Sequence, residues 1–279
     1  MAGIAEETVR IVREGDRDRY LSVLFAPEAK RPGLFALYAF NIEIARVRDL
    51  IHEPMPGEIR LQWWRDTILG EAPAVCNPVA EALIATTREY ELPPAAFDNM
   101  IEARLFDLYD DPMPSRTDLE GYCGETASAL IQLAGLVLDR DAALATADLA
   151  GHAGCAQAIA GLLRSLPIHL ARGQCYVPRD VLSAAGTSPE EFVAEKGGAA
   201  GKRAVAAMVA LAREHLAQFE EGARDMPVAL RPAYLPAAMA NAYLSLLSTT
   251  SADPFRHIHG ISPLRRHLIM ARRAFFGWR

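Results

Sequence analysis

Residues 154–178 have the sequence GCAQAIAGLLRSLPIHLARGQCYVP, and this stretch decides the fold that we expect. Its first part is almost entirely apolar, whereas its end carries Arg172 ahead of Gly173. The pattern predicts a long apolar helix with a basic exit. The longest uncharged apolar run, residues 151–163, is too short to cross a bilayer and contains His152 and Gln157. We therefore expect a buried helix of a globular protein.

Helical patterns continue on the N-terminal side. Pro32 is a favourable first residue for a helix, and the run that follows, GLFALYAFNIEIARV, is apolar on nearly every side. Such a helix must be surrounded by protein. Residues 57–69 predict a second helix, with Ile59 and Trp63 facing the core.

Two pairs of residues have the spacing of a capping box, Thr117 with Glu120 and Ser188 with Glu191. The helix after Thr117 is rich in small residues, which permit close packing between helices. No segment shows the alternation and flanking turns of a strand, and no linker divides the chain. We therefore predict one all-α domain over residues 1–279.

The composition excludes several classes of protein. The chain has 279 residues, 51% of them hydrophobic and 23% charged, which is typical of a globular protein. A net charge of −6 argues against nucleic acid as a partner. The four cysteines form no CxxC pair, and the start MAGIAEETVR lacks the apolar core of a signal peptide. We expect reduced thiols and a cytoplasmic location.

Three segments carry a resemblance to a known family. Residues 20–40 (YLSVLFAPEAKRPGLFALYAF), the tryptophans around Trp64 and the exit RGQCYVP at 172–178 resemble the squalene/phytoene synthase superfamily. The resemblance covers roughly residues 15–250. It implies a single isoprenoid-synthase-type helical bundle around a central cavity. It also implies condensation of two prenyl diphosphates, with Mg²⁺ held by carboxylates at i and i+4 of two facing helices.

The acids that this chemistry requires are largely missing. Alignment through Tyr38 places the first pair of acids at Ala45 and Asp49, and alignment through Tyr176 places the second pair at Ser165 and His169. Only Asp49 is a carboxylate. The resemblance also matches the following residues to family positions: Glu102, Asp107, Arg164, Arg172 and Tyr176. We therefore predict no metal site and no catalytic residue, with Mg²⁺ required only if the chain is a synthase after all.

Four arginines, Arg46, Arg48, Arg164 and Arg172, flank the emptied acid positions. One hypothesis is a metal-free site for an anion or a prenyl diphosphate, because guanidinium groups bind phosphate directly. The alternative, which we favour, is internal pairing. Arg46 would then pair with Glu43 or Asp49, and Arg164 with Glu102 or Asp107.

Two further clusters suggest metal ligands only weakly. Asp107, Asp110 and Asp111 have helical spacing but precede Pro112, and are more typical of a solvated turn. His152 and Cys155 are at i and i+3, which suits zinc, but no other cluster completes a set of four ligands. We interpret them as a polar pair in a core helix.

The C-terminal segment 261–279 predicts a basic helix. It contains no acid, and its arginines are Arg265, Arg266, Arg272, Arg273 and Arg279. With its aromatic residues, such a helix suits contact with an anionic membrane surface. The alternative is a terminal helix that docks on the bundle with a solvated basic face.

Within the superfamily, the blocks LYAFNIEIARVRD, QWWRDTI and RSLPIHLARGQCYVP resemble the branch of complex I assembly factors, which keeps the synthase fold without its aspartate motifs. This implies a non-catalytic role in assembling respiratory NADH dehydrogenase, with complex I subunits or assembly proteins as partners, at the inner face of the membrane. A second hypothesis is a Mg²⁺-dependent head-to-head prenyl transferase. A third is a carrier that holds an isoprenoid or quinone tail in its cavity.

Overall fold

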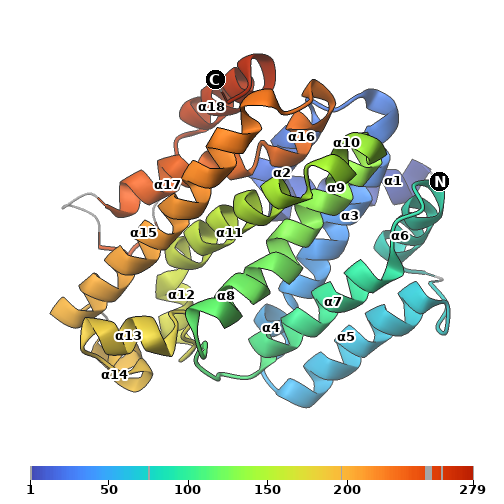
Figure 1. The fold of residues 1–279 in the computed structure, drawn as a ribbon. Helices are drawn as coiled ribbons and strands as arrows, with labels where there is room; N and C mark the ends of the chain where they lie inside the picture. Colours follow the sequence, from blue (N-terminus) through green and yellow to red (C-terminus); the bar gives the residue numbers. More distant parts are fainter. Residues whose placement is uncertain (1, 75, 196, 249–252, 259, 279) are drawn as a thin grey trace. The chain divides into compact units, whose positions relative to one another are not determined.

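Helices account for all the regular structure in the described chain, as the sequence predicts (Figure 1). The computed structural model describes residues 2–74, 76–195, 197–248, 253–258 and 260–278. No strand occurs within these ranges. The all-α prediction is confirmed.

The helices group into two compact units, each made of three separate stretches of chain. Unit 1 contains residues up to Tyr109, Ala129–Ala147 and Met226–Pro236, and unit 2 contains the rest. The α-helices of unit 1 are α1 (Ala2–Gly15), α2 (Arg17–Val23), α3 (Arg31–Ala45), α4 (Val47–Leu50), α5 (Pro54–Leu69), α6 (Pro78–Glu89), α7 (Pro94–Leu105), α9 (Ala129–Leu138), α10 (Arg140–Ala145) and α16 (Arg231–Tyr234). Those of unit 2 are α8 (Arg116–Cys123), α11 (Ala147–Arg164, apart from its first residue), α12 (Leu166–Ala171), α13 (Arg179–Ala185), α14 (Pro189–Glu195), α15 (Ala199–Gly222), α17 (Ala240–Leu247) and α18 (Pro263–Phe276).

Helix α3 is the centre of unit 1. Residues 33–41 are buried without interruption, because this part of the helix is apolar on all sides and offers no face to water. Helices α1, α6 and α9 pack around it. Pro32 lies in its first turn, as predicted.

One face of α5 packs on the aromatic core of unit 1. The Trp64 ring meets the edge of Phe40 at a centroid distance of 5.2 Å, and Phe40 meets Phe97 at 5.6 Å. The prediction that Ile59 faces the core is wrong, since 65% of its surface is exposed. The inward face instead follows Gly57, Leu61 and Trp64, at i, i+4 and i+7.

Unit 2 shows one of the two predicted capping boxes. The Glu191 backbone N–H donates to Ser188 Oγ at 3.2 Å, and the Ser188 backbone N–H donates to Glu191 Oε2 at 3.1 Å. The other prediction is wrong, because Ser115 rather than Thr117 caps α8 and accepts from the Asp118 backbone N–H. Spacing alone does not place a cap, because the cap lies where the backbone leaves the extended conformation, here at Ser115.

A close contact in unit 2 joins α11 to the π-helical segment Gly124–Ser128, which follows α8. Ser128 Oγ donates to the Gly151 carbonyl at 3.0 Å. A Cβ atom on Gly154 would lie 2.5 Å from Ser128 Cα and would also overlap Ser128 N and Oγ. The backbones therefore approach each other only because residue 154 lacks a side chain, which confirms the close packing predicted from the small residues.

The long helix predicted from residue 154 onward is broken at Ser165. Helix α11 ends at Arg164, Ser165 has φ −89° and ψ 7°, and α12 begins at Leu166. The break has a physical cause in Pro167, which has no N–H to donate to the carbonyl four residues earlier and whose ring clashes with a continuous helix. The basic segment that begins at Arg172 thus follows a short second helix, α12.

We expect Gly154→Ala to destabilise the protein by about 1–3 kcal/mol, because its methyl group meets backbone atoms that cannot rotate away. Urea unfolding measures the change. Gly161→Ala is the matched control on the same helix, where a Cβ has no atom within 4 Å, and it should leave stability unchanged or raise it by up to about 1 kcal/mol. Equal effects of the two substitutions would contradict the close contact.

Candidate functional site

The residues aligned with the first acid motif lie where α3 gives way to α4. Arg46 separates the two helices, with φ −88° and ψ 2°. Ala45 is half-buried at the end of α3, and Asp49 is exposed on α4, where its N–H bonds to the Arg46 carbonyl at 3.0 Å. The two positions are therefore on different helices rather than one turn apart on a single helix.

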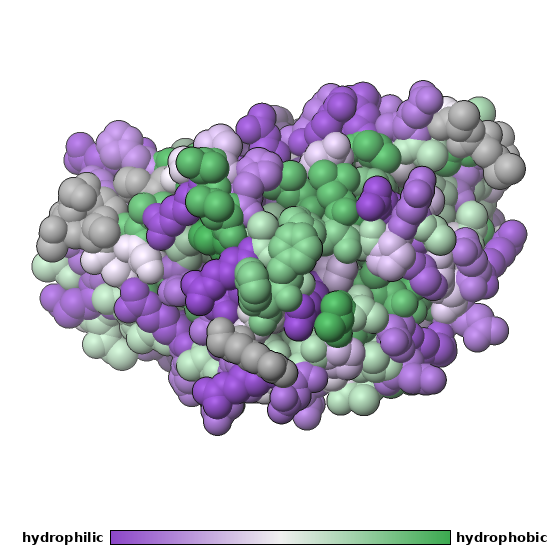
Figure 2. All heavy atoms as spheres, turned by 90° about the horizontal axis from the view of Figure 1, so that it is seen from above, coloured by the Kyte–Doolittle hydropathy of each residue, from purple (hydrophilic) through white to green (hydrophobic). Residues whose placement is uncertain are grey.

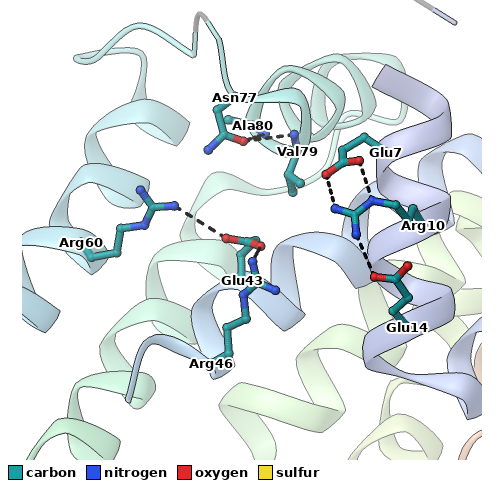
Figure 3. Close-up of polar contacts among 9 residues, drawn as sticks. All are labelled: Glu7, Arg10, Glu14, Glu43, Arg46, Arg60, Asn77, Val79 and Ala80. Atoms are coloured by element: carbon teal, nitrogen blue, oxygen red, sulfur yellow. Dashed lines mark hydrogen bonds and ion pairs between the residues drawn. The ribbon is translucent and has the colours of Figure 1, made fainter. Parts of the chain in front are cut away.

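The Arg46 guanidinium is bound within unit 1. It donates to Glu43, three residues earlier, and Arg60 of α5 approaches the other oxygen of the same carboxylate at 3.6 Å (Figure 3). Only 11% of the Glu43 side chain is exposed. This confirms the internal pairing of Arg46 with Glu43. Arg48 is half-buried and donates to the His52 carbonyl at 3.0 Å.

The two upstream acids also have arginine partners inside unit 1. Arg65 of α5 bridges two carboxylates of α7, with Asp98 at one nitrogen and Glu102 at another, the latter at 2.7 Å. Asp107 is buried and accepts from Arg104 at 3.0 Å. Glu102 and Asp107 are therefore each paired with a positive charge.

The remaining aspartates of that cluster lie outside the helix. Asp110 and Asp111 are exposed in chain without regular structure. This agrees with the solvated turn that we favoured over a displaced metal motif.

Aromatic rings surround the residues aligned with the second acid motif in unit 2. His169 packs on Tyr176 at a centroid distance of 4.7 Å, and Tyr176 packs on Tyr122 at 5.9 Å. The Arg164 guanidinium lies 4.6 Å from the ring centroid of Tyr243, in cation–π geometry. These side chains stack on one another, and neither Ser165 nor His169 supplies a carboxylate.

The exit after α12 is fixed by backbone geometry. Arg172 is exposed, and Gly173 has φ +79°, a conformation that glycine adopts without strain. The chain then pairs with Met113, whose N–H donates to the Cys175 carbonyl and whose carbonyl accepts from the Arg179 N–H, both at 3.0 Å. Cys175 is buried, and burial raises the pKa of its thiol to about 11, against an opposing hydrogen bond from Val177.

A histidine pair in unit 2 was not predicted from the sequence. His152 Nδ1 lies 3.1 Å from His215 Nδ1, and His215 Nε2 lies 3.1 Å from Glu120 Oε1. Cys155 Sγ donates to the Glu120 carbonyl at 3.9 Å. The geometry supports a polar pair in a core helix over a zinc site. No local signal identifies His215, because 63 positions separate it from His152.

The candidate acid positions do not fit Mg²⁺. This cation takes oxygen ligands, preferably carboxylates, and Ala45, Ser165 and His169 supply no carboxylate. Glu102 is already bound by a guanidinium in unit 1. Among the described residues, no three His, Cys, Asp or Glu side chains are grouped so that they could hold a metal ion. The central cavity and the convergence of the four arginines stay predictions.

Comparison with known proteins agrees with the resemblance in the sequence. The family model described as squalene/phytoene synthase matches residues 12–268. Complex I assembly factor 6 of Bos taurus is 30% identical over 258 residues, which cover 91% of this chain and 77% of the relative. Presqualene diphosphate synthase of Sinorhizobium fredii is 27% identical over 237 residues, 82% of this chain and 81% of the relative.

The fold also matches solved structures. A dehydrosqualene synthase crystallised with a ligand superposes with a TM-score of 0.79 and 18% identity, covering 97% of this chain and 95% of the other. This confirms the predicted synthase-type helical fold. At this identity the likeness concerns the fold alone.

We expect the free energy of unfolding to fall by about 2 kcal/mol through Cys175 between pH 7.5 and 10. In the unfolded chain this thiol has an ordinary pKa of about 8.5, so it loses its proton at lower pH than the folded thiol, whose pKa is about 11. The contribution is intact below pH ~8.5 and is lost as the pH rises toward ~11. Urea unfolding at both pH values should show a smaller loss for Cys175→Ala.

The exposed Cys76 supplies the control. Cys76→Ala should keep the pH dependence of the wild type. If Cys175→Ala and the wild type lose the same stability between the two pH values, the thiol is not held neutral by burial.

Proposed function

The chain belongs to the squalene/phytoene synthase family, and we propose that it is a non-catalytic member that acts in the assembly of respiratory NADH dehydrogenase. One observation carries the first half of this proposal. At the four positions where the family chemistry needs carboxylates, the chain has Ala45, Asp49, Ser165 and His169.

The surroundings of these positions support the same conclusion. Ionisation of a prenyl diphosphate needs a cation cluster to neutralise the leaving group. Next to Ala45, the Arg46 side chain is held by Glu43, so the nearest carboxylate is engaged with two guanidiniums. Near the second motif, His169 and Arg164 are stacked on tyrosines. The pairing of Glu43 with guanidiniums and the stacking of His169 and Arg164 on tyrosines support a role without a bound cation.

The second half of the proposal rests on the relatives. Proteins named complex I assembly factor 6 match along about 90% of this chain, in cattle at 30% identity and in humans at 28%. The match includes the segments around both emptied motifs. We infer that the partners are subunits of respiratory complex I or other assembly proteins, and that the bundle serves for binding.

An enzymatic role is the alternative, because presqualene diphosphate synthases are also similar to the chain over most of its length. In that case Mg²⁺ would have to be held by groups other than those at the motif positions. A purely lipid-binding role, with an isoprenoid or quinone tail in the bundle, is the third reading of the same fold.

A deletion strain tests the assembly role. We expect membranes of the strain to lose NADH:quinone oxidoreductase activity and the assembled complex on native gels, while squalene and related isoprenoids stay at wild-type levels. Reintroduction of the gene should restore the activity. Normal NADH oxidation together with missing isoprenoids would overturn the proposal in favour of the synthase.

The purified protein tests catalysis directly. With farnesyl diphosphate and Mg²⁺, we expect no release of diphosphate above the rate without protein, because the metal ligands are missing. The presqualene diphosphate synthase of Sinorhizobium fredii is the positive control. Release that depends on both protein and Mg²⁺ would show that the chain is an enzyme.

A further inference from the structure

Helix α18 has two faces of different character. On the face that packs against the rest of unit 2, Met270 is buried and Arg266 donates to the Tyr243 hydroxyl at 3.2 Å. Arg273 donates to Glu220 of α15 at 2.8 Å. These contacts hold the helix against its own unit, and they account for two of its four described arginines.

The end of the helix is anchored as well. Gly277 has φ +71°, which turns the chain back after Phe276. Trp278 is consequently buried, with its ring in edge contact with Phe219 at a centroid distance of 5.2 Å. Helix α18 is therefore a fixed part of unit 2, as predicted for a docked terminal helix; Arg279 lies outside the described residues.

The outward face combines large apolar side chains with arginines. Leu264, Leu268 and Phe275 are 70%, 61% and 72% exposed, and their spacing of four and seven residues aligns them in one stripe along the helix. Arg265 and Arg272 are exposed beside this stripe. Figure 2 looks onto the region of α18, which lies at the top of Figure 1, and hydrophobic side chains there adjoin strongly hydrophilic ones.

The charge of this segment is opposite to that of the whole chain. Residues 254–279 contain six arginines and no acid, whereas the chain carries a net charge of −6. A surface of negative charge therefore repels most of the protein and attracts this segment. The apolar stripe adds a hydrophobic attraction to such a surface that does not depend on charge.

We propose that the outward face of α18, formed by Leu264, Arg265, Leu268, Arg272 and Phe275, is a docking surface for anionic lipid. The leucines and the phenylalanine enter the boundary between headgroups and acyl chains, and the two arginines bind phosphate groups while their stems lie along the apolar region. The helix lies flat on the bilayer, because its opposite face is occupied by unit 2.

A flat lipid surface suits this face better than a protein does. The exposed stripe lies on a single straight helix, with cations at its side and no acid for a partner's basic groups. A helix of 14 residues is too short to span a bilayer, and none of the described helices combines the length and apolar composition to do so. The inference does not depend on a role in assembly.

Sedimentation of the full chain with vesicles tests the proposal. We expect binding to phosphatidylcholine vesicles that contain phosphatidylglycerol and weaker binding to phosphatidylcholine alone. Raising the salt from about 0.15 M to about 1 M should reduce binding to the anionic vesicles toward that weaker level. Leu268→Ser with Phe275→Ser should weaken binding roughly a hundredfold, from the lost burial of two large side chains. Arg265→Gln with Arg272→Gln should weaken binding to the anionic vesicles roughly twentyfold.

Leu144→Ser on α10 is the matched control, since Leu144 is a leucine of similar exposure, 60%, that lies outside the proposed lipid-binding face. It should bind vesicles like the wild type, and far-UV circular dichroism should show that every variant is folded. Failure of the wild type to bind, or equal binding by the Leu268/Phe275 variant, overturns the proposal. So does a dimer in sedimentation velocity that this variant abolishes, because the face would then bind a second copy of the chain.

Discussion

Unit 1 is built around a helix that cannot touch water. Because α3 is apolar on all sides from residue 33 to residue 41, helices must cover its whole circumference, and each of them must present an apolar face to it. Phe40 then fixes which faces of α5 and α7 turn inward, through Trp64 and Phe97. The burial ends at Ile44, one residue before the first acid position of the family motif. Ala45 itself is only half-buried, so the core of unit 1 depends little on which residue stands at this position.

Several carboxylates of unit 1 are paired with arginines. Glu43 lies between Arg46 and Arg60, and Arg65 bridges two acids of α7. Partly exposed pairs of this kind add little to stability. Their effect is on ligand chemistry, because a carboxylate that is bound to a guanidinium has to give up that partner before it can bind a cation.

Local signals in the sequence predicted the elements well and the contacts poorly. Pro32 marked the start of α3, and the Ser188–Glu191 box formed as expected, because these features act within one turn of helix. The inward face of α5 was predicted wrongly because Ile59 is apolar but exposed, and apolar residues often are.

Polar contacts between distant residues could not be predicted from local sequence patterns. The pairing of Arg65 with Glu102 spans 37 positions, and that of His215 with Glu120 spans 95. For the candidate site, the sequence offered Glu43 and Asp49 as partners of Arg46, and the structure shows the pair with Glu43. The sequence could not identify the aromatic partners of Arg164 and His169.

When both rings are neutral, the contacts of His215 with Glu120 and His152 define the tautomers of the two rings. Glu120 Oε1 is an acceptor, so His215 Nε2, which faces it, carries a hydrogen. In a neutral ring the Nδ1 of His215 is then a lone-pair acceptor, and the hydrogen between the two rings belongs to His152 Nδ1. His152 Nε2 is left as a bare nitrogen. One carboxylate on α8 thereby sets the direction of the hydrogen bonds that run from α11 through α15 to α8.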